Sequence, residues 1–193
     1  MNEELNLEEK TGFSFAREAY DWVESAITAL VFVVVIFTFV GMIISVNGSS
    51  MEPNLQHNDR LICVRMFSPP QYKDIVVITK PDNRNNPLIK RVIATSGQTV
   101  DFDVETGTVL VNGVALDEPY IAEEMELYMS DLDETYPLTV PEGHVFVMGD
   151  NRNNSWDSRE RSVGPIDERY IFGRVLYRMM PYDKMGDPNK AYK

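Results

Sequence analysis

Residues 148–159 read MGDNRNNSWDSR. The twelve residues combine small hydroxyls, amides and alternating charges, and they follow an apolar run at 145–148 that is typical of a β-strand. Two pairs of opposite charge are able to form ion pairs that stiffen the loop: Asp150 with Arg152, and Asp157 with Arg159. A solvated surface loop can have the same composition. In a stiff loop, however, Ser155 can hold a lysine amine in place.

The chain after residue 46 is β-rich. Short runs of β-branched, aromatic and aliphatic residues alternate with turns that contain Gly, Pro or Asn. These runs are 60–64, 74–78, 91–94, 108–111, 145–148 and 172–177. Asn112-Gly113 directly follows one run and is a strong hairpin signal. No useful helical period appears in this part, so we expect a mainly β fold, either an antiparallel barrel or a folded sheet.

The composition excludes several classes of function. The net charge of -12 argues against a nucleic-acid partner, which requires a basic surface. Cys63 is the single cysteine, so no internal disulfide or multi-cysteine metal site is possible, and its apolar neighbours predict a small buried side chain. Acidic residues crowd 117–136 without the spacing of an EF-hand, which favours a solvated loop. The sequence therefore predicts neither a metal nor a cofactor.

Residues 26–46 form a stretch of 21 residues without a charge. As a helix this stretch would be about 31 Å long, which matches the thickness of a bilayer's hydrocarbon core. A cleavable signal peptide is the alternative, but the run is too long and the acidic leader, residues 1–25, lacks a basic region. We therefore predict an uncleaved transmembrane anchor at 26–46 and a lipid bilayer as partner. Basic residues flank the stretch about equally, so charge does not give its orientation.

A serine and a lysine are the candidates for chemistry. Residues 47–55 read NGSSMEPNL, and the small residues beside Ser50 leave space for a substrate backbone. Lys90 lies inside an apolar strand pattern, where a lysine ordinarily extends its amine to solvent. Burial of the amine would instead lower its pKa, and a neutral lysine can deprotonate a serine without a histidine. A triad would have to use His57 or His144, which both lie in predicted turns.

Together these stretches resemble type I signal peptidases, in the shorter form with a single span. The residues that carry the resemblance are 48–55, the nucleophile box, then 74–77, 90–93, 112–113, 118–121, and 149–159, which matches the family's last box nearly residue for residue. The resemblance covers the predicted span and almost all of 47–177, with the boxes in the expected order.

The resemblance implies a Ser-Lys dyad, with Ser50 as nucleophile and Lys90 as general base. Ser155 would hydrogen-bond the amine of Lys90, and the pair of Asp157 with Arg159 would support that loop. The same resemblance gives Asp150 a structural role. The resemblance also places the oxyanion site at Ser50 and Gly48. Some members carry a serine at the position of Gly48 whose hydroxyl helps to bind the oxyanion; with Gly48 that donor cannot be a side chain, and the Ser50 N–H remains as one donor.

Other departures from the family pattern do not involve the dyad. Asn54 stands where threonine is usual, Lys73 replaces a glycine, and 94–98 reads ATSGQ in place of Gly-Leu-Pro-Gly-Asp.

The family's organisation implies the boundaries of the remaining parts. A catalytic core would comprise 47–98 and 145–180, a smaller inserted lobe would comprise 99–144, and 181–193 would be a tail. The family's anchored members place the catalytic domain outside the cytoplasm, which implies a single-pass protein of the cell membrane with a cytoplasmic leader.

The function implied is removal of signal peptides from exported preproteins that carry small residues before the cleavage site. A self-cleaving repressor is one alternative, but the chain lacks a DNA-binding region and an Ala-Gly cleavage point. A second is a His-dependent serine hydrolase. A third is an inactive or specialised anchored relative that acts in surface-protein assembly, which should have lost Ser50 or Lys90.

Overall fold

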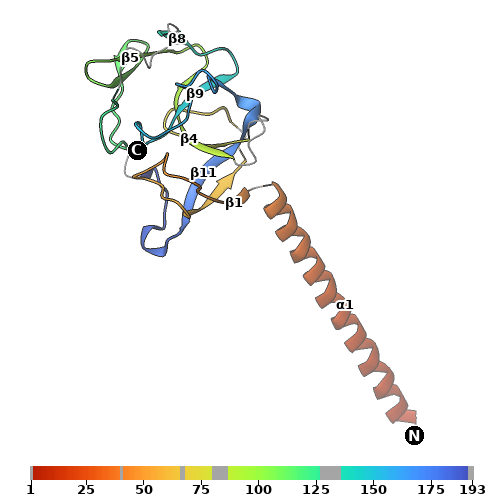
Figure 1. Ribbon diagram of the computed structural model, residues 1–193. Coiled ribbons are helices and arrows are strands. Elements are labelled where there is room, and N and C mark those ends of the chain that lie inside the picture. The colour runs from red at the N-terminus through yellow and green to blue at the C-terminus, as the bar shows by residue number, and fades with distance from the viewer. Residues whose placement is uncertain (1, 40, 66–67, 80–86, 127–135, 191–193) are drawn as a thin grey trace. The chain divides into compact units, whose positions relative to one another are not determined.

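The computed structural model describes residues 2–39, 41–65, 68–79, 87–126 and 136–190. The chain divides into two compact units, Met1–Gly41 and Met42–Lys193. The first unit is helical, and the regular structure of the second consists mainly of strands (Figure 1).

The first unit is a single helix, α1 (Asn2–Phe39), of 38 residues. In the part of the chain that the structure describes, no helix combines the length and apolarity needed to cross a membrane. The prediction that one helical span runs from 26 to 46 is wrong at its end, because Gly41–Ser45 form strand β1. Ile44 of β1 is buried in the core of the second unit. An apolar run of this kind is compatible with either a helix or a strand, and here strand pairing and burial favour the strand.

The second unit contains a large sheet of seven strands. Their spatial order is β1 (Gly41–Ser45), β2 (Arg60–Val64), β11 (Ile171–Met180), β3 (Ile75–Ile78), β4 (Leu88–Thr95), β9 (His144–Met148) and β10 (Ile166–Asp167). The pairs from β2 to β10 are antiparallel, which confirms the expected mainly β, antiparallel fold. Two 3₁₀ turns, Glu168–Tyr170 and Tyr182–Lys184, flank β11.

A smaller sheet of four strands is inserted between β4 and β9. Its order is β7 (Val114–Ala115), β6 (Thr108–Val111), β5 (Thr99–Asp103) and β8 (Leu138–Thr139), and β5 and β8 are labelled in Figure 1. Asn112 and Gly113 both have positive φ, 53° and 77°, and Val111 pairs with Val114. The two-residue hairpin predicted from Asn-Gly is therefore confirmed.

The centre of the large sheet is buried on both faces. All four residues of β3 have no exposed surface, and six of the eight residues of β4 are buried. Ile75, Val77 and Ile89 belong to one apolar cluster, whereas Val76 and Val92 belong to another. A polar side chain on β4 is therefore held away from water, which matters for Lys90.

Candidate active site

Lys90 and Ser50 are joined by a hydrogen bond of 2.7 Å between Nζ and Oγ. Lys90 is the third residue of β4, and Ser50 lies in the turn between β1 and β2. The amine is also bonded to Ser155 Oγ, at 3.1 Å. Three segments that are far apart in the sequence thus bring together a hydroxyl nucleophile, an amine and a second hydroxyl that orients the amine.

The environment of Lys90 suits a base. The residue is 2% exposed, and burial lowers the pKa of its amine from 10.5 to about 8. Nearby charges act in both directions: Asp157 and Asp150 raise this pKa, and Arg159 lowers it. About one amine in ten is therefore neutral at pH 7, and this form can accept the proton of Ser50 Oγ.

The loop that carries Ser50 is anchored by two apolar side chains that are buried in the core. Met51 and Leu55 are 1% and 0% exposed and belong to one apolar cluster. The Leu55 N–H donates to the carbonyl of Met51 at 2.8 Å. Burial of these two side chains leaves Ser50 on a turn with little freedom to move.

Asp157 organises the loop that holds Ser155. Arg159 donates to both carboxylate oxygens of Asp157, at 2.8 and 2.9 Å, as the sequence predicted. The Gly149 N–H also donates to Asp157, at 2.9 Å. Burial raises the pKa of Asp157, but the bonds from Arg159 and Gly149 outweigh it, and the pKa lies below its usual value. Asp157 is therefore a carboxylate that anchors both ends of the loop.

The predicted pair of Asp150 with Arg152 is wrong. Asp150 instead accepts two bonds of 2.6 Å from Arg91, and Arg152 donates two bonds, of 2.7 and 2.6 Å, to Glu118. The β4–β9 register places Met148 opposite Arg91, so Asp150 emerges beside that arginine. The spacing of residues along the chain could not predict Arg91 as the partner of Asp150, because Arg91 lies on a neighbouring strand.

The interpretation of the acidic segment as a solvated loop holds for Asp117, Glu123, Glu124 and Glu126, which are exposed. It is wrong for Glu118. Glu118 is 6% exposed at its side chain and pairs with a buried arginine, so it does not lie on a solvated loop. Asp131, Asp133 and Glu134 lie outside the described residues. Within the residues that are described, no cluster of three His, Cys, Asp or Glu side chains is suited to a metal ion.

The nucleophile loop and the Ser155 loop are joined directly. The Asn151 N–H donates to the carbonyl of Ser50 at 3.0 Å, and the Asn151 amide donates to the carbonyl of Ser49 at 3.2 Å. A Cβ at Gly149 would overlap both Ser155 Oγ and the Ser50 carbonyl oxygen. Gly149 is thus required for this close approach, and Asn151 is a site residue that the sequence did not single out.

Neither histidine is bonded to Ser50. Exposed His57 accepts the Gly48 N–H at its Nδ1, at 3.2 Å, and His144 Nδ1 lies 2.9 Å from the carbonyl of Glu142. Gly48, at φ 101°, therefore has its N–H engaged, whereas the N–H of Ser50 makes no hydrogen bond among the described residues. The Ser50 N–H is the available backbone donor for an oxyanion.

Cys63 is buried, as its apolar neighbours predicted. It is 0% exposed, and burial raises the pKa of its thiol to about 12. A thiolate nucleophile is therefore excluded at this position.

Comparisons with known proteins identify the family of the chain. The family model described as "Signal peptidase, peptidase S26" matches residues 19–180. The chain is 33% identical to signal peptidase I of Bacillus licheniformis over 96% of this chain and 98% of that protein, and 37% identical to probable signal peptidase I-1 of a Synechocystis species over 82% and 81%. A solved chain of a signal peptidase I from Enterococcus faecalis is 34% identical and covers 56% of this chain and 98% of its own, with a TM-score of 0.46. By the extent of these matches, the chain belongs to the signal peptidase family, peptidase S26.

Proposed function

We propose that this protein is a membrane-anchored serine endopeptidase that removes signal peptides from exported preproteins with a Ser50–Lys90 dyad. The observation that carries the proposal is the 2.7 Å contact between a hydroxyl at the surface of the core and an amine that is 2% exposed. Membership of the peptidase S26 family supports the substrate class.

The mechanism is acyl transfer. Neutral Lys90 takes the proton of Ser50 Oγ, which attacks the scissile carbonyl, and the resulting ammonium protonates the leaving amine. The N–H of Ser50 stabilises the oxyanion, and the hydrogen bond to Ser155 orients the amine of Lys90. Lys90 then removes a proton from water, and the attack of that water on the acyl-enzyme releases the product.

The substrates are preproteins that carry small residues at the first and third positions before the cut, as signal-peptide cleavage sites do. The relatives named above support this class of substrate through their names as signal peptidases.

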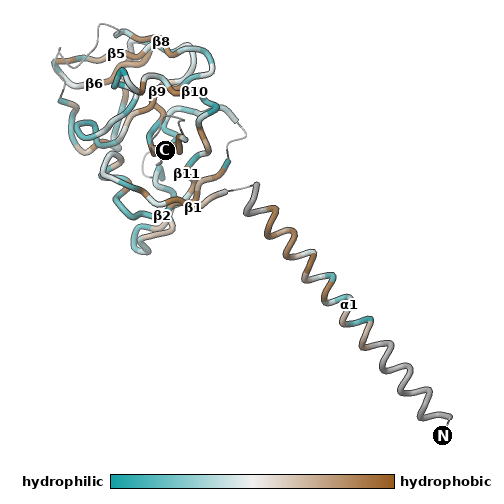
Figure 2. Tube along the Cα trace, turned by 45° about the vertical axis from the view of Figure 1, so that its right-hand side comes forward, coloured by the Kyte–Doolittle hydropathy of each residue, from teal (hydrophilic) through white to brown (hydrophobic). Residues whose placement is uncertain are grey.

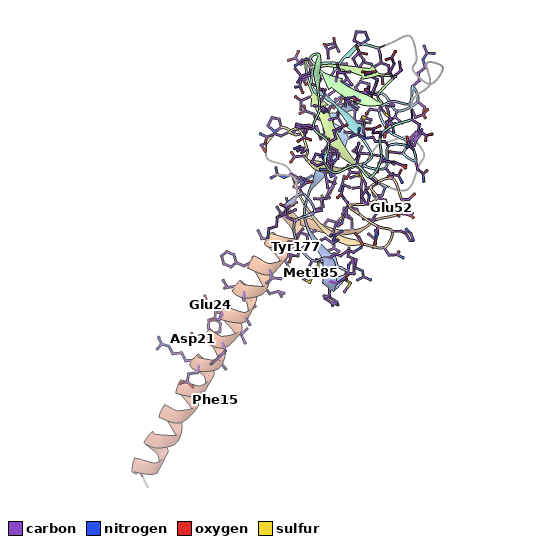
Figure 3. All side chains as sticks on the ribbon, turned by 90° about the vertical axis from the view of Figure 1, so that its left-hand side faces the viewer. Phe15, Asp21, Glu24, Glu52, Tyr177 and Met185 are labelled. Atoms are coloured by element: carbon purple, nitrogen blue, oxygen red, sulfur yellow. The ribbon has the colours of Figure 1, made fainter. Side chains whose placement is uncertain are left out.

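Although no described helix has by itself the length and apolarity of a membrane span, the proposal places the anchor in the part of α1 that is uncharged, from residue 25 onward. Figure 2 shows a predominantly hydrophobic stretch toward the C-terminal end of α1, and its side chains are exposed, including Leu30 at 62% and Phe32 at 65%. A helix from Tyr20 to Phe39 is about 30 Å long, close to the hydrocarbon thickness. Tyr20 and Trp22 would lie at the interface, which aromatic side chains prefer, beside Asp21 and Glu24, whose side chains are drawn in Figure 3.

The protein's cleavage activity tests the dyad. Wild-type protein in detergent should cut a preprotein, and Ser50→Ala and Lys90→Ala should each lower the rate by at least about 1,000-fold, as for other nucleophile and base variants. His144→Ala is the matched control and should cut at the wild-type rate. Undiminished cutting by the Lys90 variant would refute the dyad.

Extraction from membranes tests the anchor separately. Wild-type protein should stay with the membrane pellet after alkaline carbonate washing, because α1 is embedded in lipid. A double substitution, Leu30→Asp with Val34→Asp, should release the protein, since a charge at the bilayer centre costs several kcal/mol. Release of the wild-type protein would contradict the anchor and leave the dyad untouched.

A further inference from the structure

The C-terminal segment packs against the interior of the catalytic unit. Asn189 is 9% exposed, and its own N–H donates to the Asp187 carboxylate at 2.9 Å, which fixes the turn that carries it. Its side-chain oxygen accepts a bond of 2.5 Å from Arg91, and its amide nitrogen donates to the carbonyl of Lys73 at 3.1 Å. A polar residue near the end of the chain thus reaches the residue next to Lys90.

Arg91 is a fully buried cation that several segments hold together. Asp150 accepts from its Nε and one terminal nitrogen, and the guanidinium lies 4.1 Å from the centre of the Tyr120 ring. The other terminal nitrogen is out of reach of Asp150 and is bonded to Asn189 and to the carbonyl of Lys73. Asn189 therefore accepts one of the four hydrogen bonds that hold this buried guanidinium.

The same network continues to the nucleophile loop. Asp150 accepts a bond of 2.8 Å from the Asn54 amide, and Asn54 lies four residues after Ser50. The carbonyl of Asn54 in turn accepts from Arg178 at 2.6 Å. A continuous chain of hydrogen bonds therefore links Asn189, Arg91, Asp150 and Asn54, with Lys90 beside its second member and Ser50 near its last.

We propose that Asn189 is a positioning residue for the Ser50–Lys90 pair, which it serves by fixing Arg91 and, through Asp150 and Asn54, the loop of the nucleophile. This inference rests on the proposed function, in which the geometry of that pair sets the rate. Without Asn189, the guanidinium loses one acceptor and settles toward the Lys73 carbonyl. Asp150 follows the displaced guanidinium of Arg91, and the loop of Ser50 moves with it. The distance between Ser50 Oγ and Lys90 Nζ then increases, and small misplacements of this kind cost up to about 100-fold in rate.

Three full-length variants measure the effect on preprotein cleavage. Asn189→Leu keeps the volume and removes both polar groups, and we expect kcat to fall about 10- to 100-fold with KM within about twofold of wild type. Asn189→Asp keeps an acceptor for Arg91 and should retain kcat within about threefold. Lys190→Ala changes the exposed neighbour and is the matched control, with wild-type kcat expected.

The pH profile separates positioning from an effect on charge. In Asn189→Leu the whole profile of kcat should fall without a change in its midpoint, because no charge is removed. Wild-type kcat in Asn189→Leu overturns the proposal, as does an equal loss in Asn189→Leu and Asn189→Asp, which would indicate a packing role alone. If Asn189→Leu does not fold, Asn189→Ala replaces it, with the same loss expected relative to Asn189→Asp.

The dyad variants keep the two proposals apart. If Ser50→Ala and Lys90→Ala still cleave, the proposed function fails. If both are inactive while Asn189→Leu is fully active, only the role of Asn189 fails.

Discussion

The rate of cleavage should rise with pH through the pKa of Lys90, which is about 8 because the amine is buried. The fall from 10.5 corresponds to about 3 kcal/mol between the two protonation states. At pH 7 about one lysine in ten is then neutral, compared with about one in three thousand for an unperturbed amine. Between pH 7 and pH 9, kcat/KM should therefore increase about 10-fold, whereas an unperturbed lysine would give about 100-fold.

The assay is kcat/KM for a preprotein in detergent, which reports the free enzyme, measured across the pH range from about 6 to 11. Arg159→Met supplies a perturbation of known sign, because it removes a charge that lowers the pKa of Lys90 and leaves Asp157 unpaired beside the amine, so the midpoint should move upward. Arg169→Met is the matched control, since Arg169 makes an analogous pair with Asp167 at the surface and should leave the midpoint unchanged. A wild-type midpoint near 10.5, or a downward shift in Arg159→Met, would refute a desolvated base.

Three further outcomes follow from the same geometry. The pKa of Lys90 is lower in the folded protein than in the unfolded chain, so the protonated amine destabilises the fold below pH 8 and this penalty disappears above pH 10.5. Lys90→Met should therefore raise Tm at pH 7 by a few degrees, and the gain should vanish at pH 11. Gly149→Ala forces an overlap with Ser155 and should cost about 1–3 kcal/mol in urea unfolding and over about 100-fold in kcat. Arg152→Met removes the counter-charge of the buried Glu118, which keeps its bond from the Tyr120 hydroxyl, and should cost about 3–5 kcal/mol in the same unfolding assay. The double variant with Glu118→Leu should recover most of this loss.

The strands could be predicted because their residues carry the information locally. The run at 60–64 coincides with β2, and 108–111 coincides with β6, since β-branched residues bounded by turn residues have few alternatives. Gly41–Ser45 could not be assigned in this way. Its residues, GMIIS, continue an uncharged apolar run, and only the pairing of β1 with β2 separates them from the helix.

Contacts in the site could be predicted only where a family pattern or a short distance along the sequence indicated them. Asp157 and Arg159 are two residues apart, and they pair as the spacing suggested. Asp150 and Arg152 have the same spacing, yet each finds a partner from another part of the fold. Adjacent strands and loops supply those partners, so sequence distance has no bearing on them.

The charges around Lys90 explain why burial governs its pKa. Asp150 and Asp157 both raise that pKa, and an unpaired carboxylate at this depth would keep the amine protonated. Each carboxylate is instead bonded to a guanidinium, that of Arg91 or that of Arg159, so the local charges largely cancel. Desolvation then remains the largest influence and lowers the pKa of the amine. Two ion pairs that touch neither reacting atom therefore limit how far the carboxylates raise the pKa of the base, and Arg91, which lies beside Lys90 in the stretch that resembles the family, takes part through its bond to Asp150.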